Sequence, residues 1–208
     1  MSDRVRALLC LAGVLVLTGA WVLAGVLTPG FDPVRQSISQ LQRDGTATGA
    51  VMTAAFAAFA VGGAAFAPLL PRLPRAALLV AAVATLGAAL SPLGEMRGGR
   101  QDALHLAFGA TGYVSLSVLP LLAARTAGGR ARAASVVAGL VTSACLLGTV
   151  PAEAFSGALQ RAGFLAAHLW LAATAWAVLR QRQEPSSSAA QSKLCSGPGK
   201  RPSRTSST

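Results

Sequence analysis

Six long apolar runs dominate this sequence of 208 residues and limit what the chain can fold into. Each run has about the length that a helix needs to cross a hydrocarbon core of roughly 30 Å. No water is available inside that core, so helical hydrogen bonds must satisfy every backbone group of a spanning run. The pattern predicts an all-α membrane protein, a six-transmembrane-helix bundle with spans at about 7–27, 50–70, 76–93, 104–124, 133–150 and 164–179.

The composition indicates the same class of protein. Hydrophobic residues make up 53% of the chain and charged residues only 12%, whereas a soluble domain carries about 25% charge. This composition excludes a water-soluble scaffold with a basic reading face, so the net charge of +11 does not indicate nucleic-acid binding. The expected partner is the lipid bilayer. The three cysteines, Cys10, Cys145 and Cys195, are too scattered to predict a disulfide.

Loop charges predict the orientation of the chain. An even number of spans places both termini on one side, and that side carries thirteen basic and two acidic residues, against five of each on the other side. The positive-inside rule then places both termini in the cytoplasm of a multi-pass plasma-membrane protein. Residues 1–182 form the predicted transmembrane domain. The segment 183–208, rich in serine, proline, glycine and lysine, is predicted to be a disordered cytoplasmic tail.

One patterned polar stretch, residues 28–41, separates the first two runs. Asp32 followed by Pro33 is typical of a helix start, because the carboxylate accepts from first-turn amides and proline loses no hydrogen bond there. Val34, Ile38 and Leu41 follow at helical spacing and give one apolar face. The pattern predicts a short interfacial helix over 32–41 that lies across the outer ends of the bundle. An ordinary connecting loop is the alternative.

Residues 29–41, with the sequence PGFDPVRQSISQL, are also the main part of a family pattern. Its other parts are Pro92 at the end of the third run, Asp102 and His105 at the start of the fourth, and GALQR at 157–161 with Trp170. Over about residues 7–180 the chain resembles the bacterial multi-pass membrane family known as domain of unknown function 998 (DUF998). The resemblance implies a six-helix bundle in the bacterial plasma membrane and implies no activity. The family favours a glycine after its Ser-x-Leu element, where this chain has Gln42.

The charged and titratable side chains expected on the outer side form the candidate site. Asp102 and His105 are three residues apart on one helical face, so the carboxylate is expected to accept from the imidazole ring. His168 lies inside the sixth run, where keeping an ionisable residue is expensive and therefore indicates a function. The predicted outer-face polar cluster consists of Asp32, Arg35, Glu95, Asp102, His105, Glu153, Arg161 and His168.

Two interpretations of this cluster stay open. In one, His105 and His168 ligate a divalent metal ion that activates water. In the other, Asp102 and His105 cap a helix end, His168 donates to a backbone carbonyl, the glutamates pair with arginines, and no cofactor is expected. Arg35 is expected to pair with Asp32, to reach Glu95, or to bind a lipid phosphate through its planar guanidinium.

These observations favour a polytopic membrane protein that is non-catalytic or of unassigned activity. Its outer cap and buried histidines are expected to stabilise the bundle or to recognise a lipid head group or a protein partner at the outer face. The first alternative is a membrane-embedded, metal-dependent hydrolase that acts on a lipid or envelope substrate. The second is a small transporter or flippase. A transporter needs polar groups along the full depth of the membrane, and the inner halves of the six runs supply few.

Overall fold

The computed structural model describes residues 1–94 and 98–181, which form helices joined by turns. The six long helices are α1 (Asp3–Leu27), α2 (Ala47–Phe66), α3 (Arg72–Leu90), α4 (Arg100–Ala124), α5 (Gly129–Gly148) and α6 (Ser156–Gln181). Three 3-10 helices, η1 (Ile38–Leu41), η2 (Ala67–Leu69) and η3 (Glu153–Phe155), lie in or beside the connections. No strand forms within these two ranges, although Arg43 and Leu93 make an isolated parallel bridge. The predicted tail, and Glu95 of the predicted cluster, lie outside the described residues.

All six predicted spans are confirmed as helices that are long and apolar enough to cross a membrane. Every helix begins earlier in the sequence than its apolar run, because polar residues form the first turn. The Ser2 hydroxyl caps α1 by accepting from the Val5 N–H at 3.3 Å, and the Thr46 hydroxyl caps α2 by accepting from the Gly49 N–H at 2.9 Å. At the other end, α3 stops at Leu90, earlier than predicted and shortly before Pro92.

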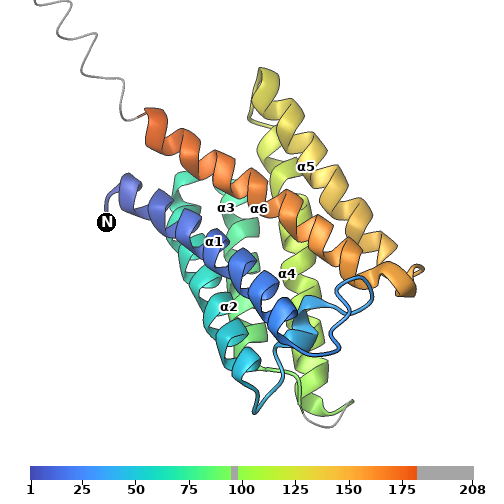
Figure 1. The fold of residues 1–208 in the computed structure, drawn as a ribbon. Helices are drawn as coiled ribbons and strands as arrows, with labels where there is room; N and C mark the ends of the chain where they lie inside the picture. Colours follow the sequence, from blue (N-terminus) through green and yellow to red (C-terminus); the bar gives the residue numbers. More distant parts are fainter. Residues whose placement is uncertain (95–97, 182–208) are drawn as a thin grey trace, which may run out of the picture.

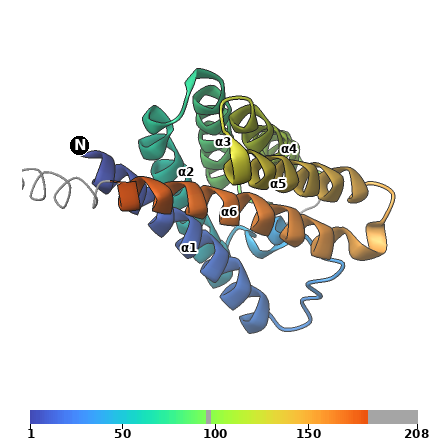
Figure 2. The same cartoon turned by 90° about the horizontal axis from the view of Figure 1, so that it is seen from above.

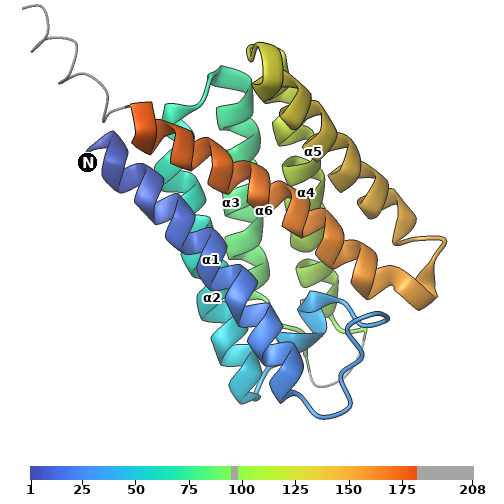
Figure 3. The same cartoon turned by 45° about the horizontal axis from the view of Figure 1, so that its top comes forward.

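The six helices form a closed bundle (Figure 1). Each helix packs against the next one along the chain, and α6 packs against both α5 and α1, between which it lies in the view from above (Figure 2). Figures 1 and 3 show the start of α1 and the end of α6 at one end of the bundle, while the connection from α1 to α2 lies at the other. The connections from α3 to α4 and from α5 to α6 must share that second end, because the helices alternate in direction.

Glycines allow α1 and α2 to approach each other closely. A Cβ atom at Gly13 would lie 2.9 Å from the Ala58 carbonyl oxygen, and one at Gly62 would overlap the Leu9 carbonyl. Close backbone approach of this kind is how helices associate in a bilayer, where burying apolar surface gives no advantage over lipid.

The outer surface of the bundle is apolar. Leu15, Leu106 and Leu169 come from three different helices and are 69%, 71% and 64% exposed. Exposing so many leucine and valine side chains along six long helices would be unfavourable in water but is favourable against the hydrocarbon chains of lipids. The bundle is therefore built for a lipid bilayer.

Candidate functional site

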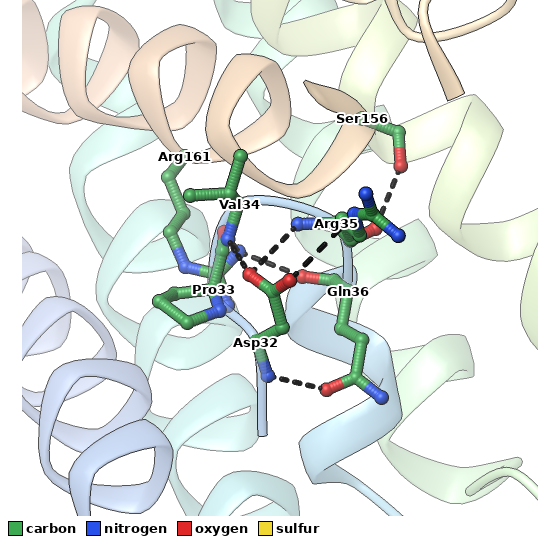
Figure 4. Close-up of polar contacts among 7 residues, drawn as sticks. All are labelled: Asp32, Pro33, Val34, Arg35, Gln36, Ser156 and Arg161. Carbon is green, nitrogen blue, oxygen red and sulfur yellow. Dashed lines mark hydrogen bonds and ion pairs between the residues drawn. The ribbon is translucent and has the colours of Figure 1, made fainter. Parts of the chain in front are cut away.

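The segment that follows α1 and includes η1 begins as the sequence predicts. We call residues 28–41 the lid segment. The Asp32 carboxylate caps one helical turn, accepting from the N–H groups of Val34 at 2.9 Å and Arg35 at 3.3 Å (Figure 4). The Gln36 N–H donates to the Asp32 carbonyl at 2.8 Å, and the Gln36 side chain accepts from the Asp32 N–H at 2.7 Å. A carboxylate, a proline and a glutamine thus fix this turn locally.

The single helix predicted over 32–41 is not formed, because the chain becomes extended at Ser37 before η1 begins. The reason lies in α6. The Ile38 N–H donates to the Gln160 side-chain oxygen at 2.7 Å, so a residue 122 positions away replaces the carbonyl that a continuous helix would supply. Ile38 and Leu41 are 3% and 2% exposed and form part of the bundle core. The lid segment therefore inserts between helices instead of resting on the membrane surface as an amphipathic helix.

Backbone contacts fix the lid segment to the first turn of α6. The Ala158 N–H donates to the Val34 carbonyl at 2.9 Å, and the Ser156 hydroxyl donates to the Arg35 carbonyl at 2.9 Å (Figure 4). Gly157 permits this approach, because a Cβ atom there would overlap the Gln36 carbonyl. The first and last parts of the family pattern, 29–41 and 157–161, are consequently in direct contact.

Arg161 completes the contact between the lid segment and α6. Its Nη1 donates to the carbonyl oxygens of Pro33 at 2.7 Å, Gln36 at 2.8 Å and Gly157 at 2.9 Å. Its guanidinium carbon lies 5.6 Å from the centre of the Trp21 ring and 5.2 Å from that of Phe31, within cation–π range. One side chain of α6 therefore holds the lid segment by two carbonyls and also packs against α1.

Asp102 and His105 do not form the predicted carboxylate–imidazole pair. Asp102 accepts from the backbone N–H groups of Gly94 and Gly98, both at 2.9 Å. His105 Nδ1 lies 2.8 Å from the Ser91 carbonyl oxygen and 3.2 Å from that of Ala88. A carbonyl can only accept, so this nitrogen carries the hydrogen. The i, i+3 spacing was interpreted wrongly because the turn between α3 and α4 supplies stronger local partners to each side chain.

Gln42, like His105, bonds backbone carbonyls at the end of α3. Its side chain is fully buried, and its amide nitrogen donates to the Thr53 hydroxyl at 2.9 Å and to the carbonyls of Ala89 at 3.1 Å and Ala88 at 3.3 Å. The last carbonyls of a helix have no partner within the helix, so a buried helix end needs donors of this kind. The residue at which this chain departs from the family pattern thus caps α3.

His168 lies deep in the bundle, 2% exposed. Its Nδ1 is 2.9 Å from the Thr18 hydroxyl of α1, not bonded to a backbone carbonyl as one interpretation expected. Its ring packs against Phe59 and Phe164 at centroid distances of 5.0 and 5.9 Å. Nε2 is buried and has no hydrogen-bond partner among the described residues.

The structure therefore divides the predicted cluster into separate groups. Asp32, Arg35 and Arg161 meet at the lid segment, whereas Asp102 and His105 serve the turn between α3 and α4, and His168 bonds to α1. Glu153 is exposed in η3. Within residues 1–94 and 98–181, no group of three or more histidine, cysteine or acidic side chains is placed to hold a metal ion. A role for each of these residues in function stays a prediction.

Sequence reasoning missed the residues that connect the lid segment to α6. These are Trp21 and Phe31, which flank Arg161, and Ser156 and Gln160, which bond the lid backbone. One signal was available: Ser156 and Gln160 stand in the first turns of an apolar helix, where polar side chains can serve a neighbouring stretch of backbone.

Six long apolar helices define the class of this protein, an integral membrane protein with six candidate spans. Residues 10–177 match the family model described as "Protein of unknown function (DUF998)", and the chain belongs to that family. The match includes the lid segment and the start of α6. Comparisons with curated proteins and with solved structures gave no match.

Proposed function

We propose that this DUF998 protein recognises anionic lipid head groups with the exposed face of its lid segment. The observation that carries the proposal is Arg35. Its side chain is 73% exposed, and its ion pair with Asp32 is long, at 3.8 Å. A planar guanidinium that is so weakly engaged suits a phosphate, which it binds through two parallel hydrogen bonds.

Apolar side chains next to Arg35 support the proposal. Val34 is 42% exposed, and Phe155 of η3 is 59% exposed. The Ser156 hydroxyl, next in sequence to Phe155, bonds the Arg35 carbonyl, and we therefore treat the three side chains as one surface at an end of the bundle. We call Val34, Arg35 and Phe155 the lid surface. Apolar groups around a cation are typical of a protein surface that enters the head-group region of a bilayer.

The distribution of charge supports the orientation that this function requires. Among the described residues, the end of the bundle with the termini carries Asp3 and the basic residues Arg4, Arg6, Arg72, Arg75, Arg125, Arg130, Arg132 and Arg180, whereas the lid end is mixed in charge. The positive-inside rule then favours cytoplasmic termini and a lid surface outside, in a bacterial plasma membrane. A reporter that is active only outside the cytoplasm is expected to stay inactive when fused to either terminus. Activity at either one would contradict this orientation.

Lipid retention tests the proposal. The full chain would be reconstituted in bilayers of equal parts phosphatidylglycerol and phosphatidylcholine and extracted under mild conditions. Native mass spectrometry would then identify the lipids that stay bound. The wild type is expected to retain phosphatidylglycerol preferentially. Arg35→Ala should reduce that preference by about threefold, because an exposed ionic contact contributes about 0.2–1 kcal/mol.

The matched control is Arg100→Ala, which removes an exposed arginine from the first turn of α4 at the same end of the bundle. It should leave the preference unchanged. If the wild type and Arg35→Ala retained phosphatidylglycerol with equal preference, the lid surface would not recognise the head group.

The metal-dependent hydrolase is a separate hypothesis with a separate test. It requires one ion shared by His105 and His168, whose Nδ1 atoms face partners on different helices, α3 and α1. Elemental analysis of gently purified protein would support it by finding one transition-metal ion per chain. Removing that ion with a chelator should then lower the unfolding temperature. Protein that is stable and free of such a metal would refute it.

A further inference from the structure

Two side chains that are in contact where α1 meets α6 each carry a buried N–H donor without an acceptor among the described residues. Arg161 Nη1 is occupied by three carbonyl oxygens, but Nη2 of the same guanidinium is buried and has no partner among the described residues. The indole Nε1 of Trp21 is likewise buried and unpartnered within them, on a residue that is 9% exposed. The two side chains are in contact, with the guanidinium carbon 5.6 Å from the centre of the Trp21 ring.

No anion is hydrogen-bonded to Arg161 among the described residues, although the Asp32 carboxylate lies near enough to act on its charge. The three groups that Arg161 contacts by hydrogen bonds are neutral carbonyls, and the ion pair that Asp32 makes among the described residues is with Arg35. Arg161 as a whole is half-buried, but its Nη2 is buried, and a buried N–H group of a cation is unfavourable unless an acceptor, preferably a charged one, reaches it. Each donor alone could be a local defect, but two in contact indicate one missing acceptor.

The lid segment contributes an aromatic ring to the surroundings of this pair. The Phe31 ring of the lid segment lies 5.2 Å from the guanidinium carbon, and it packs near Gly25, where a Cβ atom would be 3.4 Å from the ring. Arg161 stands in the second turn of α6, at the lid end of the bundle. That is the depth at which the phosphates of a bilayer leaflet lie if α6 spans it.

We propose that Arg161 Nη2 and Trp21 Nε1 bind a phosphate-type oxyanion beneath Phe31. Guanidinium and indole N–H groups are donors only, so they select an acceptor, and the positive charge of Arg161, to which no anion is hydrogen-bonded among the described residues, favours an anion. The oxyanion is supplied either by the phosphate of an anionic phospholipid or by free inorganic phosphate. This site is distinct from the lid surface, because Arg35 and Phe155 are exposed whereas both donors here are buried.

Thermal unfolding of the full chain in a neutral, phosphate-free detergent tests the site. Two probes are titrated separately: inorganic phosphate and short-chain dihexanoyl phosphatidylglycerol. A ligand that binds the folded protein raises the unfolding midpoint in proportion to the logarithm of its concentration, which yields a dissociation constant. A rise with the lipid alone assigns the site to a phospholipid, and a rise with both assigns it to phosphate itself. A rise with neither probe overturns the proposal.

Trp21→Phe is the decisive variant, because it deletes the indole N–H and keeps an aromatic ring against Arg161. Loss of one hydrogen bond should weaken binding about threefold to tenfold. Trp176→Phe is the matched control: Trp176 is 51% exposed at the far end of α6, beside Arg180, and should bind as the wild type does. Undiminished binding by Trp21→Phe would overturn the assignment.

Arg35→Ala separates this proposal from the proposed function. It should leave intact the part of the midpoint rise that Trp21→Phe removes, while it lowers phosphatidylglycerol retention in bilayers. If Arg35→Ala abolished binding in the unfolding assay and Trp21→Phe did not, the anion would belong to the lid surface and the buried site would be refuted.

Discussion

Arg161→Met should release the lid segment from α6. Methionine keeps much of the packing against Trp21 and Phe31 but removes the donors to the carbonyls of Pro33 and Gln36, which lie 2.7 and 2.8 Å from Nη1. Two average hydrogen bonds in a membrane protein contribute about 1 kcal/mol, since each contributes about 0.6. Two charge-assisted bonds of the kind measured in soluble proteins contribute at least about 3 kcal/mol. We expect a loss of about 2 kcal/mol in the free energy that holds the lid segment closed.

Hydrogen–deuterium exchange measures this loss directly. The reporters are the N–H groups of Gln36 and Ile38, which donate to the Asp32 carbonyl and the Gln160 side chain in the closed lid segment. A change of 2 kcal/mol in the opening equilibrium corresponds to about thirtyfold faster exchange. The amides of α5 serve as an internal reference, because the hydrogen bonds that hold the lid segment to the end of the bundle go to α6.

The matched control is Arg35→Met, the same substitution at a residue whose side chain makes only an exposed ion pair of 3.8 Å. It should accelerate exchange of the lid amides less than about threefold, in keeping with the small contribution of surface ion pairs. If Arg161→Met and the wild type exchanged their lid amides at the same rate, Arg161 would not hold the lid segment and the reasoning would fail.

Three further substitutions test the packing around the site. Gly157→Ala should displace the lid segment and lower the unfolding temperature, because its Cβ atom would overlap a lid carbonyl, whereas Gly109→Ala, with nothing within 4 Å of its Cβ position, should be neutral. Gln42→Met should destabilise the protein by about 1–3 kcal/mol in denaturant titrations, since it removes the donor to the Ala89 carbonyl at the end of α3, whereas the Ala88 carbonyl keeps the Ser91 N–H and His105. Thr18→Val should weaken the protein by about 0.5–1.5 kcal/mol by removing the hydroxyl partner of His168, and unchanged stability would show that this contact contributes nothing.

The six helices could be predicted because their signal is local. A run of about twenty apolar residues specifies a spanning helix without any knowledge of its neighbours. The same holds for the Asp32 turn, whose carboxylate bonds groups two and three residues away. Local rules identified the helices and the cap at the start of the lid segment, and all of these form.

The candidate site depended on contacts that a local pattern does not contain. Ile38 leaves the expected helix because Gln160, 122 residues later, bonds its N–H. His105 turns away from Asp102 because carbonyls at the end of α3 come within reach only after α3 and α4 have packed. The spacing of residues along one helix shows which side chains share a face, but not which backbone groups of another helix will meet that face.

Disulfide trapping between the lid segment and α6 tests the central claim, that these two parts of the family pattern form one unit in the membrane. Val34 and Ala158, whose backbones are joined by a hydrogen bond of 2.9 Å, would be replaced by cysteine in a chain from which the three native cysteines have been removed. We predict rapid cross-linking of the 34–158 pair under mild oxidation in native membranes, and none between positions 34 and 180, at the opposite end of α6. A 34–158 pair that stays reduced, or that cross-links no faster than the 34–180 pair, would contradict the account.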